Sequence, residues 1–391
     1  MEWKEYQIQD VCRLINGRAY SNDEMLEHGK YKIVRVGNLS GGNSTWFYSD
    51  LELPADKYCH NGDLLFAWAC TFGPHIWKED NTIFHYHIWK IVEDKDVVDR
   101  RFFYYYLKFA TGGFLGALNG SVMVHITKSS MEKMIIRIPK KLEDQRRIAS
   151  ILSSLDRKIE LNNKINADLE EMAQAIFKNW FVDFEPFKDG KFVDSELGMI
   201  PEGWKVGRLK DLLYLRKDSI KAANKGNLPY LPIDTIPMHC LVATDFKSND
   251  EAKSSLQTFE QNDIVVGAMR VYFHRVILAP CKGITRTTCF VLSVKNENAL
   301  AYSLMQCNQD EAISFAEKTS KGSTMPYAVW DGGYGEYKVV IPPSEVMKSF
   351  NDLLSNFFSK MNKNAIENSR LSLLRDTLLP RLMSGELEVP E

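Results

Sequence analysis

Two stretches of the sequence, residues 100–131 and 264–296, contain basic side chains and no carboxylate. Their cationic and imidazole residues are Arg100, Arg101, Lys108, His125 and Lys128 in the first stretch, and Arg270, His274, Arg275, Lys282, Arg286 and Lys295 in the second. Positive charge gathered on one face binds phosphate groups, whatever the net charge of the whole molecule. The chemistry that these residues indicate is binding of a polyanion such as nucleic acid, although acid-free stretches of this length also occur in strand-rich proteins.

No motif in the sequence predicts catalysis. The chain contains no P-loop, no GxSxG and no HExxH motif. His85 and His87 share one face of a predicted strand, with Cys59 and His60 as conceivable company, but core or surface histidines explain them better than a metal site does. We therefore expect no catalytic residue, no metal and no cofactor in this chain.

The sequence contains an internal duplication, and the elements that must position the basic stretches occur in both copies. Four short motifs recur in the same order at an offset of between 200 and 203 residues, which chance does not explain. The matched segments are Trp3 with Trp204, residues 61–65 with 261–265, Gly120-Ser121 with Gly322-Ser323, and Ile138-Pro139 with Ile341-Pro342. We therefore expect two copies of one structural unit.

Each copy begins with about 140 residues of mixed pattern. Short apolar runs alternate with Gly, Asn and Asp, and residues 83–91 show the period of two that is typical of a strand. A short helical stretch from Arg101 to Lys108 interrupts the strands. The sequence predicts an α+β lobe in each copy.

Each copy ends with a long helix, the first of which we expect from Leu142 to Phe181. Apolar residues and asparagines follow one another alternately at intervals of four and three, the pattern of a coiled-coil seam. Arg375 is the single charged residue in the two seams. The seam residues are Ile148, Leu152, Leu155, Ile159, Asn162, Asn166, Leu169, Ala173, Ile176 and Trp180, and in the second copy Phe350, Leu354, Phe357, Met361, Asn364, Asn368, Leu371, Arg375, Leu378 and Leu382.

Two asparagines occupy the same positions in both seams. In an antiparallel pair of helices Asn162 would lie near Asn368, and Asn166 near Asn364. Buried asparagine costs stability but specifies the register of the two helices. Parallel helices would also align asparagine with asparagine, so the direction rests on the short linker, residues 183–203, between the first helix and the second lobe. The alternative is that these are surface asparagines on loosely amphipathic helices.

The composition is that of a globular protein of two or three domains: 391 residues, 45% hydrophobic and 26% charged. Its seven cysteines are scattered without a CxxC motif, and there is no apolar run of membrane-spanning length and no leader at the N-terminus, so we expect a cytoplasmic, reduced chain. The net charge of −2 is an average over unlike parts. Residues 1–142 carry 18 basic and 17 acidic side chains and residues 204–342 carry 17 and 14, so the acidic excess lies in the helices, linker and tail.

Several segments resemble the specificity (S) subunits of type I restriction–modification systems, and the resemblance covers essentially the whole chain. The second copy departs from the family pattern, because 262–267 is followed by Met269-Arg270-Val271-Tyr272 without a Thr-x-Gly, and its helix lacks the Gln-Arg-Arg-Ile entry. The segments that carry the resemblance are Ile138-Pro139, residues 143–149, 177–187, 195–198 and 200–204, the end of the chain at 378–389, and in the first lobe 62–67 with Thr71-Phe72-Gly73.

The resemblance implies an architecture of two α/β target-recognition lobes in a pseudo-two-fold arrangement, joined by two long helices that form an antiparallel coiled coil. The implied parts are a first target-recognition domain at 1–142, a first long helix at 143–183, a linker at 184–203, a second target-recognition domain at 204–343, and a second long helix with the C-terminal tail at 344–391. A helix of about 35–40 residues spans about 50–60 Å, long enough to place two lobes about one duplex turn apart.

The resemblance also implies function and partners. Each lobe would read one half of a bipartite, asymmetric site in double-stranded DNA, while the helices set the spacing. Two methyltransferase (modification) subunits would dock on the helices, and restriction or translocase subunits would join them. S-adenosylmethionine, ATP and magnesium would be bound by those partners, and this chain would be a non-catalytic subunit without a membrane partner.

Loop residues with polar, aromatic or basic side chains are the candidates for DNA contacts, because base edges need hydrogen-bonding groups and phosphates need cations. For each, the alternative is a solvated surface or a strand-packing role; Arg270 and Arg275 are the strongest candidates. The candidates are Arg35, Asn38, Trp68, Thr71, His75, Lys78, Ser121, His125 and Lys128 in the first lobe, and Asp234, Thr235, Arg270, Tyr272, His274, Arg275, Arg286, Lys321, Ser323 and Tyr327 in the second.

The other function class that fits the sequence is a duplicated protein–protein adaptor. Its lobes would bind peptides or proteins without DNA specificity, and the seam would serve for dimerisation. Protection of a split DNA sequence by a complex with a methyltransferase would distinguish the two.

Overall fold

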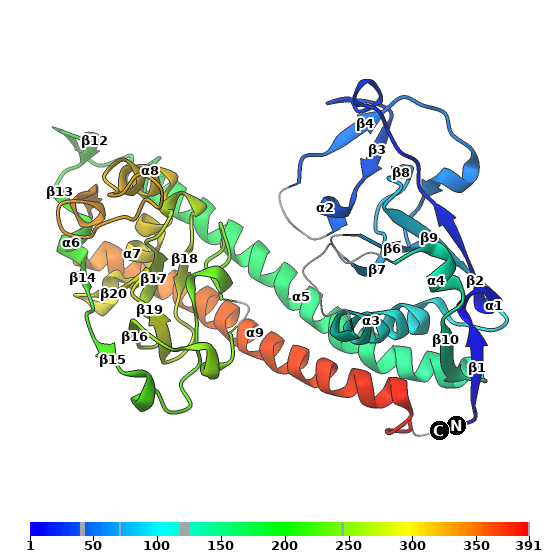
Figure 1. The fold of residues 1–391 in the computed structure, drawn as a ribbon. Coiled ribbons are helices and arrows are strands. Elements are labelled where there is room, and N and C mark those ends of the chain that lie inside the picture. The colour runs from blue at the N-terminus through cyan, green and yellow to red at the C-terminus, as the bar shows by residue number, and fades with distance from the viewer. Residues whose placement is uncertain (40–43, 70–71, 118–125, 244–245, 390–391) are drawn as a thin grey trace. The chain divides into compact units, whose positions relative to one another are not determined.

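The computed structural model describes residues 1–391 except 40–43, 70–71, 118–125, 244–245 and 390–391 (Figure 1). The chain divides into two compact units, each of which contains part of both long helices. Unit 1 comprises residues 1–156 and 373–391, and unit 2 comprises residues 157–372. The functional boundaries expected from the sequence stay predictions.

Unit 1 contains the first lobe, which we call lobe one. Its strands form a β1-β10 pair and two four-stranded sheets, in the orders β2-β9-β6-β7 and β4-β3-β8-β5. Only the β3–β8 pairing is parallel among the strand pairs of this lobe that the structure describes. The elements are β1 (Trp3–Gln7), α1 (Ile8–Val11), β2 (Cys12–Asn16), β3 (Tyr31–Val34), α2 (Val36–Leu39), β4 (Phe47–Ser49), β5 (Tyr58–Cys59), β6 (Leu64–Ala67), β7 (Gly73–Ile76), β8 (Thr82–Phe84), β9 (Ile88–Glu93), α3 (Arg100–Ala117), α4 (Lys128–Glu132) and β10 (Ile135–Pro139).

Unit 2 contains the second lobe, lobe two, preceded by a β-hairpin of β11 and β12. Its sheets have the orders β13-β21, β14-β20-β17-β18 and β15-β16-β19. The elements are β11 (Phe192–Ser195), β12 (Gly198–Pro201), β13 (Lys205–Arg208), α6 (Leu209–Leu212), β14 (Leu213–Leu215), β15 (Ser219–Ile220), β16 (Leu256–Phe259), β17 (Ile264–Gly267), the 3₁₀ turn η7 (Val271–Phe273), β18 (Val276–Leu278), β19 (Gly283–Arg286), β20 (Cys289–Val294), α7 (Leu300–Cys307), α8 (Asp310–Lys318) and β21 (Lys338–Ile341).

The two lobes repeat the topology of one four-stranded sheet and of two further strand pairs, as the offset of the sequence motifs predicts. Order β2-β9-β6-β7 in lobe one corresponds strand for strand to β14-β20-β17-β18 in lobe two. The antiparallel β5–β8 pair likewise corresponds to β16–β19, and β1–β10 to β13–β21.

The repeated Gly/Asn-Asp motif builds the turn that leads into the central strand of each lobe. Gly62 and Asn262 both have a positive φ, of 89° and 69°, a conformation that glycine and asparagine tolerate better than other residues. The next residue, Asp63 or Asp263, accepts a hydrogen bond from the backbone N–H three residues earlier, at 3.0 and 2.7 Å. The motif is therefore explained by local backbone geometry.

The two long helices are α5 (Leu142–Phe181), at the bounds expected from the sequence, and α9 (Ser344–Ser384). All twenty predicted seam residues are buried or half-buried. In unit 1, Ile148 and Leu152 of α5 share a buried core with Leu382 of α9, whereas in unit 2 Phe177 of α5 shares one with Phe350. Helical stability at this length comes mainly from such burial of an apolar face.

The asparagines of the seam pair antiparallel within unit 2, as predicted. Asn162 Nδ2 donates to Asn368 Oδ1 at 2.9 Å, and Asn364 Nδ2 donates to Asn166 Oδ1 at 2.8 Å. All four side chains are buried, so the alternative of surface asparagines is wrong. That they specify the register of the helices stays a prediction.

Arg375, the charged residue of the seam, is neutralised inside unit 1. Its Nη1 lies 2.7 Å from Asp156 Oδ1, and Tyr105 OH of α3 donates to Asp156 Oδ2 at 2.6 Å. Burial, together with the hydrogen bond to Asp156, raises the pKa of Tyr105. This network joins lobe one to both long helices.

The strand expected over residues 83–91 is two strands joined by a tight turn. β8 ends at Phe84 and β9 begins at Ile88, and the two strands belong to different sheets. The alternation of apolar and polar residues continues through the turn, which is why the pattern does not reveal it. Among the residues that the structure describes, no helix is both long and apolar enough to cross a lipid bilayer.

Candidate nucleic-acid interface

One end of each lobe is formed by corresponding loops, which we call the hairpin end. Among the described residues it consists in lobe one of Trp68, Ala69, Phe72 and the 85–87 turn, and in lobe two of residues 268–275, 287–288 and 321–327. The same backbone hydrogen bond closes both: Trp68 N–H donates to His87 O at 3.1 Å, and Ala268 N–H donates to Thr288 O at 2.9 Å. The duplicated backbone thus presents two different sets of side chains at corresponding positions.

The hairpin end of lobe one is a cluster of aromatic and imidazole rings. The Trp68 ring centroid lies 4.9 Å from that of His87 and 5.9 Å from that of Trp89. Trp68 Nε1 donates to the carbonyl of Tyr86 at 2.9 Å, while the Tyr86 side chain is 40% exposed. Aromatic rings that are fixed in position by packing and have exposed edges suit stacking and apolar contact with bases.

The surroundings of the histidines in this cluster favour the neutral form of the imidazole. Burial lowers the pKa of His85 to about 4, with further contributions from His87 and Arg35. Burial also lowers the pKa of His87, and burial together with Lys108 lowers that of His75 on β7. A neutral imidazole offers one hydrogen-bond donor and one acceptor, so these residues fit base edges better than phosphates.

The remaining candidates of lobe one lie on short elements around this cluster. Arg35 is half-buried, donates to Thr45 O at 2.9 Å and lies over the Phe47 ring at 4.3 Å. Asn38 accepts from Arg35 N–H at 3.0 Å, so its amide supports the α2 turn.

Two lysines complete the described candidates of this lobe. Lys78 is exposed, and Lys128 on α4 lies 3.6 Å from Glu132. Thr71, Ser121 and His125 lie outside the described residues.

The hairpin end of lobe two is exposed and basic. Lys321 and Tyr327 exchange two backbone hydrogen bonds of 2.9 Å, and Arg270 N–H donates to Pro326 O at 2.8 Å. Arg270, Lys321, Ser323 and Tyr327 are exposed there. Lys321 and Tyr327 also line a hollow of about 500 Å³ together with Thr288. Cations and hydroxyls around such a hollow fit both phosphate and base contacts.

Further candidates of lobe two have partners within the protein. Arg275 Nη1 donates to the carbonyl of Ile233 at 2.9 Å and to that of Ile236, so much of its hydrogen-bonding capacity is used in holding this loop. Asp234 forms an ion pair with Lys247 at 2.5 Å, which lowers the pKa of Asp234.

Three more candidates of this lobe have varied surroundings. Thr235 Oγ1 donates to Pro232 O at 2.9 Å. Arg286, the last residue of β19, and Tyr272 of η7 are exposed.

The structure contradicts the prediction that His274 contacts DNA. The side chain is buried, with Nε2 3.1 Å from Asn308 O and Nδ1 3.1 Å from Asp310 Oδ1. A ring with both nitrogens engaged inside the protein cannot contact a DNA groove without rearrangement, so we remove His274 from the DNA-contact candidates. Its basic neighbours in sequence gave no sign of this burial.

Tyr86, His85 and His87 lie in the hairpin end of lobe one, although their sequence pattern did not make them candidates for DNA contact. The period of two placed them on a strand, where they would alternate between sheet faces. The aromatic-rich run His85-Tyr86-His87 was the available signal, because two polar rings flanking an exposed tyrosine are unusual inside a buried strand.

Comparisons with known proteins identify the family. Residues 1–171 match the family model described as type I restriction modification DNA specificity domain. The type I restriction enzyme MjaIX specificity subunit of Methanocaldococcus jannaschii is 30% identical over 313 residues, which cover 76% of this chain and 71% of that protein. The chain belongs to the family of type I restriction enzyme specificity subunits.

Two further relatives extend over nearly the whole chain. The HindI specificity subunit of Haemophilus influenzae is 24% identical over 99% of this chain and 100% of its own length. The crystal structure of the type I restriction–modification S subunit from M. genitalium matches with a TM-score of 0.60 at 16% identity, covering 98% of this chain and 96% of that one. This likeness is one of fold, and it confirms the predicted class of mixed α and β lobes connected by long helices. Specificity subunits are non-catalytic components of their systems, which agrees with a chain that is not itself an enzyme.

Proposed function

We propose that this specificity subunit reads a bipartite, asymmetric site in double-stranded DNA, with the hairpin end of each lobe contacting one half. The observation that carries the proposal is the matched pair of hairpin ends, built on the same backbone hydrogen bond from different side chains. One scaffold used twice suits binding to two places on a duplex. Different side chains at corresponding positions suit two different half-sites.

The two hairpin ends would read DNA by different chemistry. Trp68, Tyr86 and the neutral imidazoles of lobe one would provide apolar contact and hydrogen bonds to base edges. Arg270 and Lys321 of lobe two would add bidentate hydrogen bonds to base edges or contacts with phosphates. The contribution of phosphate contacts to affinity falls as the salt concentration rises. The spacing between half-sites would be set by α5 and α9.

The long helices would carry the partner subunits. Several apolar side chains on them remain exposed, among them Leu373 at 71% and Leu161 at 52%, and exposed apolar surface marks interaction sites. We propose that two methyltransferase subunits dock there, and that restriction subunits join that complex. S-adenosylmethionine, ATP and magnesium would be bound by the partners.

The test is to purify the chain with its methyltransferase and to map methylated sites in the source genome. We expect one split motif with two dissimilar halves. Replacing residues 204–343 by the second lobe of another specificity subunit should change one half and leave the other unchanged. Equal binding to all DNA with no methylated motif would refute the proposal, and would favour the protein–protein adaptor.

A further inference from the structure

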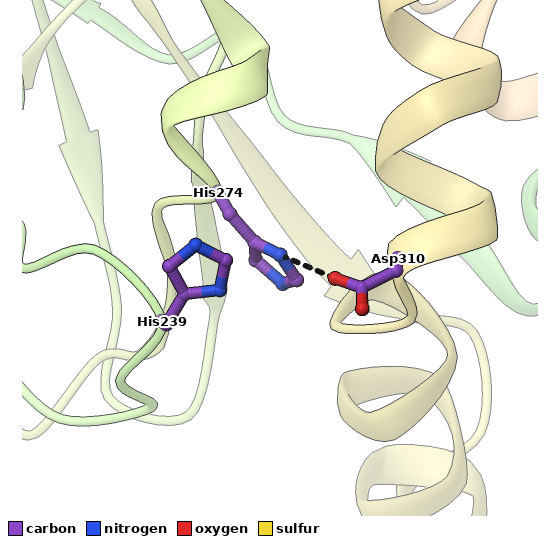
Figure 2. A group of neighbouring side chains, drawn as sticks. All are labelled: His239, His274 and Asp310. Carbon is purple, nitrogen blue, oxygen red and sulfur yellow. Dashed lines mark ion pairs between the residues drawn. The ribbon is translucent and has the colours of Figure 1, made fainter. Parts of the chain in front are cut away.

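Three potential metal ligands, His239, His274 and Asp310, lie together in unit 2 (Figure 2). One ligand atom from each lies within 4.8 Å of the other two. The residues come from three separate segments: a loop, the residue that follows η7, and the first residue of α8. The three residues are 35 and 36 positions apart in the sequence, so no short motif indicates a metal site here, and none was expected.

The distances fit a metal ion with little rearrangement. His274 Nδ1 lies 3.1 Å from Asp310 Oδ1. Two ligands at about 2.0–2.1 Å from a tetrahedral zinc ion are separated by about 3.3 Å, so this pair already spans one edge of such a site. The His239 and His274 ring centroids are 4.5 Å apart, and His239 is exposed, so its ring has room to turn toward the other two ligands.

The hydrogen bonds of His274 present the correct nitrogen. Its Nε2 lies 3.1 Å from the backbone carbonyl of Asn308, which can only accept, so Nε2 carries the proton. In a neutral ring Nδ1 then has a free lone pair, and it points toward Asp310, as Figure 2 shows. A lone pair facing a carboxylate is repulsive unless a proton or a cation lies between them. A ligating histidine whose other nitrogen donates to a carbonyl is the usual arrangement around bound metal.

The backbone holds the two histidines in an uncommon conformation. His239 and His274 have φ values of 49° and 48°, in the left-handed region that side chains other than glycine seldom adopt. His239 N–H donates to His274 O at 2.8 Å, which fixes the two residues side by side. Such strain persists where the surrounding structure imposes it, and it gathers at functional positions.

We propose that His239, His274 and Asp310 bind a divalent transition-metal ion, Zn²⁺, with the fourth position open to the adjoining cavity. That cavity, of about 710 Å³, is lined by all three residues and by the end of α5, including Gln174 and Lys178. Two imidazoles and one carboxylate favour zinc over magnesium or calcium, which prefer oxygen ligands.

The bound ion would fasten three segments of lobe two to one another inside unit 2. The loop that carries His239 already contacts α5, because Leu241 N–H donates to Glu170 Oε2 at 3.1 Å. A metal bridge from this loop to the residue after η7 and to α8 would hold the loop, and with it this contact to α5, in place. Three protein ligands would hold this loop in place, and that role is independent of which bases the lobe reads.

The test is a titration of the purified full chain, freed of metal by a chelator, with Zn²⁺ and separately with Co²⁺. We expect one strongly bound zinc per chain, the visible absorption bands of tetrahedral cobalt, and a higher thermal unfolding midpoint with zinc. His239→Ala and Asp310→Asn should each weaken zinc binding at least tenfold. Both side chains are exposed, so circular dichroism of the metal-free variants should match that of the unaltered chain.

His60→Ala is the matched control, because His60 faces Asp80 at 3.9 Å on the surface of lobe one, and no third ligand joins them among the described residues. It should leave zinc binding unchanged. Absence of strong zinc binding, or binding that survives both His239→Ala and Asp310→Asn, would overturn the proposal in favour of a simple ion pair between His274 and Asp310. Loss of the cobalt bands in Cys240→Ser with retention in His239→Ala would overturn it as well, since the ligand would then be the neighbouring thiol.

Discussion

The two lobes share the order of one four-stranded sheet and differ in the loops at one end of that sheet. In lobe one the turn after β8 is His85-Tyr86-His87, packed against Trp68. In lobe two the corresponding turn is Thr287-Thr288, beside the exposed Lys321 and Tyr327. The order of the sheet is therefore constrained by packing, whereas the side chains of the hairpin end can change from packed aromatic rings to exposed cations.

A second difference lies where the long helices meet each lobe. In unit 1 the seam contains the Asp156–Arg375 ion pair, and the positions 202 residues away in unit 2 are Phe358 and Ala173, both in the buried core. The junction in unit 1 adds charge and hydrogen bonds to its apolar core, whereas the matching positions in unit 2 are apolar. The following predictions test these two comparisons, from the largest expected effect to the smallest.

Asp156→Ala should lower the free energy of unfolding by about 2–3 kcal/mol, because it leaves the Tyr105 hydroxyl without its acceptor and removes one of the two carboxylates, Asp156 and Asp376, that pair with Arg375. Urea denaturation followed by circular dichroism measures this. The double variant Asp156→Phe with Arg375→Ala copies the apolar junction of unit 2, and should be less destabilised than Asp156→Ala. If the double variant loses as much free energy of unfolding as Asp156→Phe and Arg375→Ala lose in sum, apolar packing cannot replace the ion pair at this junction.

Arg270→Ala should weaken binding of the cognate DNA about tenfold through one half-site only, because Arg270 belongs to the hairpin end of lobe two. Fluorescence anisotropy with duplexes altered in either half measures the effect. Lys282→Ala is the control: Lys282 lies in the same acid-free stretch but pairs with Glu260 at 2.8 Å, away from the hairpin end, and its loss should have little effect. Equal weakening of both halves by Arg270→Ala would show that the lobes do not read DNA separately.

Much of the fold could be predicted because it follows from repeats and periodicity. The duplication, both long helices and the Asn162–Asn368 and Asn166–Asn364 pairs depend on regular spacing, which sequence shows directly. The predicted helix bounds, residues 142 and 181, agree with α5.

The interface could be predicted only in part, because it depends on how loops fold back. The turn at 85–87 has the alternation of a strand, so its exposed tyrosine was overlooked. His274 lies between Arg270 and Arg275 in its neighbourhood of the sequence, yet its ring is buried against Asn308 and Asp310. Burial of a single loop side chain depends on contacts from distant segments such as Asn308, which local sequence does not encode.

The polar layer of the seam gives a smaller prediction. Asn162→Leu should cost about 1–2 kcal/mol of unfolding free energy, because it leaves the buried Asn368 Oδ1 without its donor, whereas Asn368 Nδ2 keeps Asn163 as its acceptor. The double change Asn162→Leu with Asn368→Leu should recover most of that loss, since an apolar pair fits a helix seam. Denaturant titration of all three chains measures both effects. A double variant no more stable than Asn162→Leu would mean that the layer contributes by shape and not by its hydrogen bond.

The smallest expected effect is an acid sensitivity confined to lobe one. The folded-state pKa of His85 is lowered to about 4 by burial, below the ordinary value of about 6.5. Below about pH 6.5 the unfolded chain therefore takes up the proton first, so stability present at neutral pH declines as the pH falls toward 4. The corresponding turn of lobe two, Thr287-Thr288, has no group that titrates in this range. Hydrogen exchange should thus show weaker protection of β8 and β9 at about pH 5 than at about pH 7, and His85→Asn should reduce the change. If the loss of protection between about pH 7 and about pH 5 were the same in His85→Asn, protonation of His85 would not be its cause. The inference that burial in the hairpin end of lobe one lowers the pKa of His85 would then be wrong.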